Sequence, residues 1–184
     1  MNQLEPVAEL DGSGNLVAQF VYASKPHVPD YMIRYSGGLP VGTYRLVSDH
    51  IGSVRLVVDV DGGGVVQRID YDEFGNPTLL AGSWDVQPFG FAGGLWDAHA
   101  QFVRFGARDL DSNTGRWTTK DPVGFIGGLN LYSYLGGDPL NQTDASGFAV
   151  PSPHPTPCLF LRHPPPLQIR HPRRRKKWRL AASI

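Results

Sequence analysis

Short runs of alternating hydrophobic and polar residues follow one another along the first 148 positions, and clusters of Asp, Gly and Asn separate them. Alternation of this kind places one face of a strand in a core, and the intervening residues favour tight turns. The pattern predicts strands over residues 16–22, 54–60 and 65–71, joined into antiparallel hairpins.

Two of these hairpins resemble each other in sequence. The segments VAELDGSGNLVAQFVYAS and LVVDVDGGGVVQRIDYDEFGN each contain a strand, a turn with an acidic residue and Gly, a second strand and an aromatic residue. A repeat of about 20 residues predicts units that stack, because none can bury its apolar face alone. Only Asn130–Leu135 favours a short helix, since Leu129, Tyr132 and Leu135 recur every third residue. We therefore predict an all-β fold of twisted antiparallel hairpins, ending in a small plug with one short helix.

The charge distribution divides the chain near residue 148. Residues 1–148 contain all 17 acidic residues and nine Lys or Arg, whereas residues 149–184 contain the other eight basic residues and no acidic one. The second segment also contains eight Pro, which lack a backbone donor and fit neither a sheet nor a long helix. We expect residues 149–184 to form a disordered, variable Pro/Arg-rich tail.

Three interpretations of this tail are open: a remnant of a cargo, a nucleic-acid-binding peptide, or sequence without a selected function. The run Arg173–Lys177 with Trp178 could bind phosphates and stack a base. Basic runs are usually only solvated, however, so nucleic acid is the weaker expectation. A truncated or frame-shifted cargo is favoured, because so short a Pro-rich segment cannot form an enzyme core.

The rest of the composition restricts the class of protein. The single cysteine, Cys158, excludes an internal disulfide framework. No apolar run is long enough to predict a membrane span. The first residues lack the basic and apolar regions of a signal peptide, so we expect export, if it occurs, to depend on other machinery or on an upstream region.

Two stretches of the chain carry a resemblance to a known family. The first runs from Tyr44 to Val54 and continues at Asp70–Asn76, with the elements "D-x-x-G-S" and "Y-D-x-x-G-N". The second lies between Gly106 and Phe148, and its elements are Gly106–Asp109, Gly115–Trp117, Asp121–Gly124, Gly127–Tyr134, Asp138–Asn141 and Asp144–Phe148. In order and spacing these residues resemble the repeat-associated core of Rhs/YD-repeat proteins, which are related to the C components of bacterial toxin complexes.

The resemblance implies three regions: partial YD-repeat hairpins over 1–43, a repeat-associated core domain over 44–148, and the variable tail over 149–184. In the family, a β-ribbon of YD repeats winds into a hollow shell, and the core domain plugs one end. The implied function is encapsulation of a C-terminal cargo and its autoproteolytic release. The implied partners are an upstream YD-repeat shell, a secretion apparatus and the chain's own tail, and the location is secreted or on a bacterial cell surface, without a cofactor.

The same resemblance indicates the residues of an aspartyl autoprotease. The matching positions are Asp109 and Asp121, with Arg108 beside the first, and the cut follows the terminal element, between Phe148 and Ala149. In that element Ala145 stands where the family has Pro, and Phe148 stands where it has Leu. Two carboxylates can share one proton, so that one activates water while the other donates to the scissile carbonyl. A turn over 112–115 could bring the two carboxylates together on antiparallel strands.

Other interpretations of these residues are open. Asp before Pro or Gly commonly caps a turn, which needs no catalysis. The segment from Asp109 begins like a calcium loop, but its Gly falls one position late and Lys120 stands where a bidentate Glu is required. Gly124, Gly127 and Gly128 lack the lysine pattern of a phosphate loop. The alternative function is a non-catalytic structural remnant with neither an intact shell nor a cargo.

Overall fold

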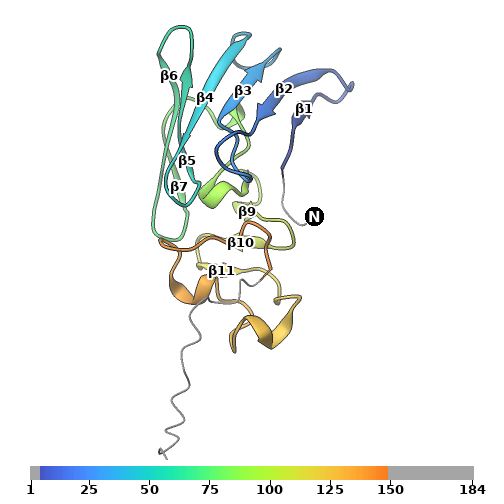
Figure 1. Ribbon diagram of the computed structural model, residues 1–184, viewed down its shortest axis with the longest axis vertical. Helices are drawn as coiled ribbons and strands as arrows, with labels where there is room; N and C mark the ends of the chain where they lie inside the picture. The colour runs from blue at the N-terminus through green and yellow to red at the C-terminus, as the bar shows by residue number, and fades with distance from the viewer. Residues whose placement is uncertain (1–4, 149–184) are drawn as a thin grey trace, which may run out of the picture. The chain divides into compact units, whose positions relative to one another are not determined.

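A computed structural model describes residues 5–148, which form two antiparallel sheets (Figure 1). The larger sheet has seven strands that neighbour one another in chain order: β1 (Ala8–Leu10), β2 (Leu16–Val21), β3 (Tyr31–Arg34), β4 (Gly42–Ser48), β5 (Val54–Asp59), β6 (Val65–Tyr71) and β7 (Pro77–Ala81). The three strands predicted from hydrophobic alternation coincide with β2, β5 and β6. The prediction of an all-β fold is confirmed.

The smaller sheet has four strands in the order β11-β10-β9-β8. Its strands are β8 (Leu95–Asp97), β9 (Phe102–Arg104), β10 (Asp109–Asp111) and β11 (Arg116–Trp117). Single 3₁₀ turns supply the only helical geometry within residues 5–148: η1 (Trp84–Val86), η2 (Phe91–Gly93), η3 (Gly124–Gly127) and η4 (Leu135–Gly137). The predicted turn at 112–115 joins β10 to β11, as expected.

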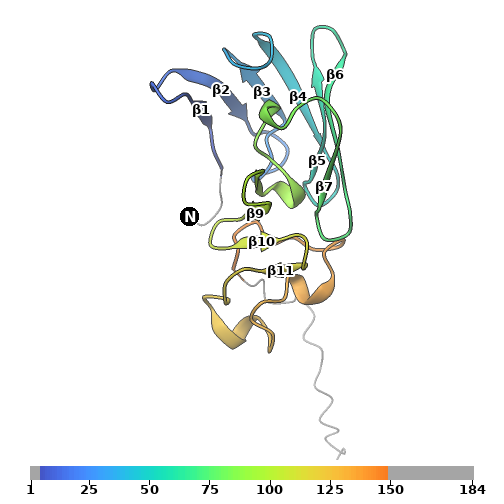
Figure 2. The ribbon, with the colours of Figure 1, turned by 180° about the vertical axis from the view of Figure 1, so that it is seen from behind.

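One face of the larger sheet forms a hydrophobic core with the segment that follows β7. Buried residues alternate along β4, and Ala18 and Phe20 of β2, two residues apart, belong to the same core, as the period of two in a strand requires. Val86 and Phe89 pack against this face, and the rings of Phe20 and Phe89 meet edge to face at 5.0 Å. Figure 2 shows the segment, in green, crossing this face of the sheet.

A second core surrounds Trp117 and Tyr134. The centroids of these two rings lie 5.2 Å apart, and Phe105 packs edge to face on Trp117 at 5.5 Å. Phe91 joins the same cluster through Tyr134. This aromatic core holds β11 against the loops that follow it.

The helix predicted over Asn130–Leu135 is wrong in its position. The Leu131 and Tyr132 carbonyls accept bonds from the N–H groups of Asp121 and Trp117 instead of from residues further along a helix. Tyr134 is buried in the aromatic core, and Gly136 and Gly137 have positive φ, so the backbone turns there. Tertiary bonding therefore overrides the weak three-residue spacing, and 3₁₀ turns lie before and after the segment.

The predicted division at residue 44 falls within β4, and the seven-stranded sheet continues across it. β3 and β4 pair from Tyr31↔Arg45 to Arg34↔Gly42. The division into three regions stays a prediction, and the tail lies outside the described residues.

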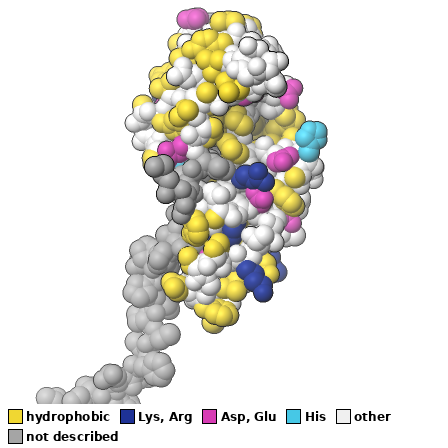
Figure 3. Space-filling model, turned by 90° about the vertical axis from the view of Figure 1, so that its right-hand side faces the viewer, with side chains coloured by type: hydrophobic (Ala, Val, Ile, Leu, Met, Phe, Trp, Pro, Cys, Tyr) yellow, Lys and Arg dark blue, Asp and Glu magenta, His cyan; other side chains and the backbone are white. Residues whose placement is uncertain are grey.

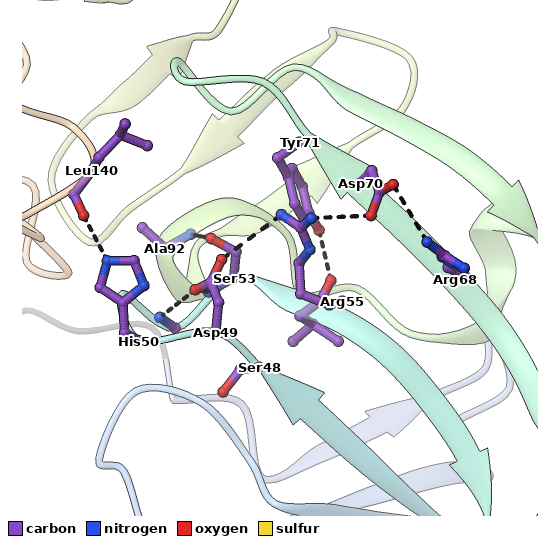
Figure 4. A network of polar contacts seen from close by, with 12 residues as sticks. Ser48, Asp49, His50, Ser53, Arg55, Arg68, Asp70, Tyr71, Ala92 and Leu140 are labelled. Carbon is purple, nitrogen blue, oxygen red and sulfur yellow. Dashed lines mark hydrogen bonds and ion pairs between the residues drawn. The ribbon is translucent and has the colours of Figure 1, made fainter.

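The two motifs of the first stretch meet beside β5 and β6 (Figure 4). Arg55 bonds Asp70 at 3.0 Å and lies 3.9 Å from Asp49, while the Tyr71 hydroxyl donates to the Val54 carbonyl. On the other side of the turn, the Ala92 N–H donates to Ser53 Oγ. His50 Nε2 lies 2.7 Å from the Leu140 carbonyl oxygen. This network ties the larger sheet to residues far along the chain.

Within residues 5–148, no helix is long and apolar enough to cross a membrane.

Candidate functional site: a buried arginine between two carboxylates

Arg108, just before β10, is at the centre of the site. Its side chain is 1% exposed. Nη1 lies 3.0 Å from Asp121 Oδ2, Nη2 donates to Asp144 Oδ2 at 3.2 Å, and Nε donates to the Gly147 carbonyl. The guanidinium also stacks over the Trp117 ring at 4.1 Å from its centroid, an arrangement that favours a cation.

Asp121 reaches Arg108 from a turn that it closes itself. Asp121 Oδ1 accepts from the Val123 N–H at 2.9 Å, and the Gly124 N–H donates to the Asp121 carbonyl. Gly124 has φ +65°, which glycine adopts without strain. One carboxylate oxygen therefore stabilises the turn, and the other is free to pair with Arg108.

Asp144 repeats this arrangement near the end of the described residues. Its Oδ1 accepts from the Ser146 hydroxyl at 2.8 Å, and the Gly147 N–H donates to the Asp144 carbonyl. Its Oδ2 accepts from Arg108. The Ala107 N–H donates to the Ser146 carbonyl at 2.9 Å, so the segment 144–147 lies along residues 106–108.

Burial dominates the electrostatics of the cluster. Burial raises the pKa of Asp144, because loss of water disfavours the charged carboxylate, and the bonds from Ser146 and Arg108 offset only part of this. Burial likewise lowers the pKa of Arg108, against the attraction of Asp121 and Asp144. One buried cation thus pairs with two carboxylates.

A cleft of about 460 Å³ opens beside this cluster. Arg108, Trp117, Asp121 and Asp144 form one wall, and the loop 128–136 forms much of the other. Residues on this loop and before it expose large apolar side chains: Phe125 is 72%, Ile126 81% and Leu129 93% exposed. Figure 3 shows hydrophobic side chains gathered at the lower end of one face of the molecule, beside Lys and Arg side chains.

Asp109 lies outside this cluster. It pairs with Arg104 across β9 and β10, with Arg104 Nε donating to Asp109 Oδ1 at 2.9 Å, and its side chain is 31% exposed. Asp109 and the buried Leu110 alternate along the strand, so they face opposite sides. The structure therefore brings Arg108 and Asp121 together, whereas no hydrogen bond among the described residues joins Asp109 to Asp121. A working Asp109–Asp121 pair stays a prediction.

The predicted cleavage site begins next to the cluster. Phe148 is half-buried, and its N–H donates to Ser146 Oγ at 3.2 Å. Arg108 holds the carbonyl of Gly147, one residue before it. Ala149 lies outside the described residues.

Asp144 is the site residue that sequence reasoning missed. It was identified only as part of the terminal element. Asp121–Gly124 and Asp144–Gly147 share the spacing Asp-x-x-Gly, but the turns at Asp11 and Asp72 have it too, so the spacing indicates a turn and does not by itself indicate a buried carboxylate. Two such turns with buried carboxylates need a buried cation, and Arg108 was already a candidate.

The calcium-loop interpretation finds no support in the geometry around Asp111. This carboxylate closes its own turn through the Asn113 N–H and the Thr114 hydroxyl. Among residues 5–148, no group of three or more His, Cys, Asp or Glu is placed to hold a metal ion.

The Teneurin YD-shell family model matches residues 1–136. Among similar proteins, Teneurin-3 of Danio rerio is 28% identical over 109 residues, which cover 54% of this chain and 4% of the relative. Toxin subunit YenC2 of Yersinia entomophaga is 31% identical over 97 residues, which cover 50% of this chain and 10% of the relative. The matched region is thus a tenth or less of the length of these relatives.

Solved structures of toxin complexes share the fold. A TcdB2-TccC3-TEV structure superposes with a TM-score of 0.61 at 21% identity, over 76% of this chain and 7% of that chain. A TcdB2-TccC3 structure without its hypervariable C-terminal region gives 0.56 at 18% identity, over 77% of this chain. At these sequence identities the similarity shows a shared fold and nothing further.

Proposed function

This chain belongs to the Teneurin YD-shell family, and from that premise we propose that it is the closing segment of a larger toxin-type β-shell that cuts itself after Phe148. The observation that carries the proposal is the buried Arg108, which contacts Asp121, Asp144 and the carbonyl before Phe148 at once. A buried cation beside a chain segment predicted to be cut is the arrangement a self-processing site needs.

In the proposed reaction, an ionised aspartate removes a proton from water, and the oxygen attacks the Phe148 carbonyl carbon. The protonated second aspartate donates to the carbonyl oxygen, which gives a tetrahedral gem-diol. The first aspartate then passes the proton taken from water to the Ala149 nitrogen as the C–N bond breaks, and a hydroxyl proton of the diol returns to the second aspartate. The products are a Phe148 carboxylate and an Ala149 amine. Asp121 and Asp109 are the proposed carboxylates, and Arg108 keeps the segment before the bond in place.

This assignment requires Asp109 to exchange its partner. Its bond to Arg104 lies at the surface, where an ion pair contributes only about 0–1 kcal/mol. Release of Asp109 from Arg104 is therefore inexpensive. Because Asp109 faces the side of β10 opposite to the buried Leu110, its approach to Asp121 also requires the backbone of the hairpin to move. The rest of a complete shell could hold the hairpin in the productive arrangement.

The two edge strands of the seven-stranded sheet are evidence in favour of a larger shell. β1 and β7 are the outer strands of the seven-stranded sheet, and an outer strand exposes backbone groups that can pair with further strands. The exposed Phe125, Ile126 and Leu129 are a second surface suited to burial by a partner. We propose that upstream YD repeats cover both surfaces, that the shell encloses a C-terminal cargo, and that the protein acts outside the cell.

Intact-mass measurement of the purified 184-residue chain tests the proposal. Cleavage after Phe148 separates residues 149–184 and leaves a body that ends at residue 148. Asp121→Asn should leave the chain whole, because it removes a carboxylate and changes the shape little. A cut at any other bond, or cutting undiminished in Asp121→Asn, would refute the proposed site.

A structural role is the second candidate, and one observation favours it. The Asp-x-x-Gly turns at Asp11 and Asp72 close hairpins through carboxylate hydrogen bonds to residues of the same turn. The turns at Asp121 and Asp144 can therefore be explained by folding alone. In this case Arg108 only joins two loops, and the chain stays intact under all conditions.

A further inference from the structure

The ring of His27, in the loop between β2 and β3, lies between two glycine turns. A Cβ at Gly52 would lie 2.7 Å from His27 Nε2, and a Cβ at Gly93 would lie 2.6 Å from His27 Cδ2. Both glycines have positive φ, +101° at Gly52 and +76° at Gly93. The ring therefore fills space that exists only because neither turn has a side chain there.

The same two turns are joined by a hydrogen bond. The Ala92 N–H donates to Ser53 Oγ at 3.0 Å, and Ser53 is completely buried (Figure 4). Phe91, next to Ala92, belongs to the aromatic core. We call the contact between residues 49–53 and 91–93 the turn junction. It connects the seven-stranded sheet to the segment that leads into the smaller sheet.

His27 Nε2 is buried in the turn junction and has no hydrogen-bond partner among the described residues. In the neutral ring, an unprotonated Nε2 lacks only a donor. Protonation of the ring would bury a charged N–H group with no acceptor. Burial of an unpaired charge costs far more than loss of one hydrogen bond to a neutral group.

The charged groups around the ring are engaged elsewhere or have the wrong sign. Lys25, in the same loop, is a second cation and donates to the Asp49 carbonyl. The Asp49 carboxylate accepts from two N–H groups of its own turn and lies 3.9 Å from Arg55. His50 Nε2 lies within hydrogen-bond distance of a carbonyl oxygen further along the chain, and Glu5 is exposed. Residues 91–93 contribute no charge.

We propose that His27 is a pH-sensitive switch, in which the neutral ring holds the turn junction closed and protonation of the ring opens it. The switch acts whether or not the chain is cut, because the junction lies outside the Arg108 cluster. Opening separates Ala92 from Ser53 and exposes the apolar surface of both turns to water.

The direction of the pH dependence follows from the surroundings of the ring. Burial lowers the pKa of His27, and Lys25 acts in the same direction, while the Ile51 backbone and Glu5 oppose them. The folded state therefore binds this proton less tightly than the unfolded chain does. The closed junction is fully stable above the ordinary pKa of 6.5, and stability is lost as the pH falls from there toward the lowered pKa.

Hydrogen exchange at the Ala92 amide of the full chain, between about pH 5 and pH 8, tests the switch. The protection factor, which compares exchange with that of an unfolded chain at the same pH, should be constant above pH 6.5. Below this pH it should fall by up to about tenfold per pH unit, the limit for one proton. His27→Gln, with a neutral amide, should abolish the fall. The control His99→Gln changes an exposed histidine in the β8–β9 turn and should keep it.

Constant protection in the unmodified chain, or a fall that persists in His27→Gln, overturns the proposal. Loss of the fall in His99→Gln also overturns it, because the effect then belongs to another histidine. If His27→Gln does not fold, the NMR titration of the His27 ring in the unmodified chain decides. A midpoint below pH 6.5 supports the switch, and a midpoint at or above pH 6.5 overturns it.

Discussion

The two carboxylate oxygens of a turn aspartate bind different partners in this protein. At Asp11 and Asp72, both oxygens serve the turn: one accepts from backbone N–H groups and the other from the side chain of Asn15 or Asn76. At Asp121 and Asp144 one oxygen serves the turn, and the second pairs with Arg108. A turn motif thus becomes a buried charge site when a cation replaces the asparagine.

Arg108 should be far more important for stability than its neighbour in sequence, Arg104. Arg108→Gln leaves two buried carboxylates without their cation, and loss of one partner of a buried pair costs about 3–5 kcal/mol. Arg104→Gln breaks a pair whose arginine side chain is 62% exposed, so it should cost no more than about 1 kcal/mol. Urea unfolding of both variants measures the difference. Equal free energies of unfolding would contradict the central role of Arg108.

Asp11 should make stability depend on pH. The side-chain bond from Asn15, with the backbone bonds from Asn15 and Ser13, lowers the pKa of Asp11 below its ordinary value of 3.8. The folded state therefore binds this proton less tightly than the unfolded state, and the contribution is present above pH 3.8 and disappears as the pH falls through the lowered pKa. The melting-temperature difference between the unmodified chain and Asp11→Asn should be largest at neutral pH and vanish in acid. A melting-temperature difference that stays the same from neutral pH to acid would contradict this role of Asp11.

The fold is built from hairpins, and two of their turns have the same pattern of hydrogen bonds. Asp11–Asn15 and Asp72–Asn76 have the same spacing and the same set of backbone and side-chain bonds. In each turn the fourth residue is a glycine with positive φ, +83° at Gly14 and +88° at Gly75. The two turns differ in their surroundings, since Gly14 faces open space and Gly75 packs on the Phe91 ring.

This difference can be measured with one substitution at two equivalent positions. Gly14→Ala meets only the cost of a left-handed backbone, about 1–2 kcal/mol. Gly75→Ala meets the same cost and also drives a methyl group into Phe91, which adds about 1–3 kcal/mol of overpacking. The additional loss in the free energy of unfolding of Gly75→Ala, compared with Gly14→Ala, should be measurable by equilibrium unfolding of the two variants. Equal losses would show that Phe91 moves aside freely and does not fix the turn.

Local patterns sufficed to predict the hairpins but not the elements built by distant contacts. β5 and β6 follow directly from alternation and the glycine-rich turn between them. The segment 130–135 could not be predicted in this way, because the bonds to Asp121 and Trp117 determine its backbone. The site shows the same division: Arg108 and Asp121 were identified by resemblance, whereas Asp144 reaches Arg108 across a sequence separation of 36 residues.

At the scale of the whole molecule, we propose that the described residues are one part of a larger shell. Teneurin-3 and YenC2 are about ten or more times as long as the matched region, and the edge strands β1 and β7 expose backbone groups that could pair with further strands. The Arg108 cluster, in contrast, is complete within residues 105–148. The bonds between Arg108 and the segment 144–147 thus involve only described residues, and we propose that the arrangement of Asp109 depends on the remaining shell.

The carboxylate pair gives the decisive prediction for the whole molecule, because cleavage turns one chain into two. Asp109→Asn and Asp121→Asn should each abolish the cut, and the double variant should be no slower than either, since two groups that share one proton act as a unit. Arg104→Gln should cleave as fast as the unmodified chain or faster, because it frees Asp109 from its surface partner. Intact mass against time measures all four proteins, and thermal unfolding verifies that each is folded. Undiminished cleavage in Asp109→Asn would remove Asp109 from the mechanism and leave Asp121 as the only carboxylate of the proposed pair in the site.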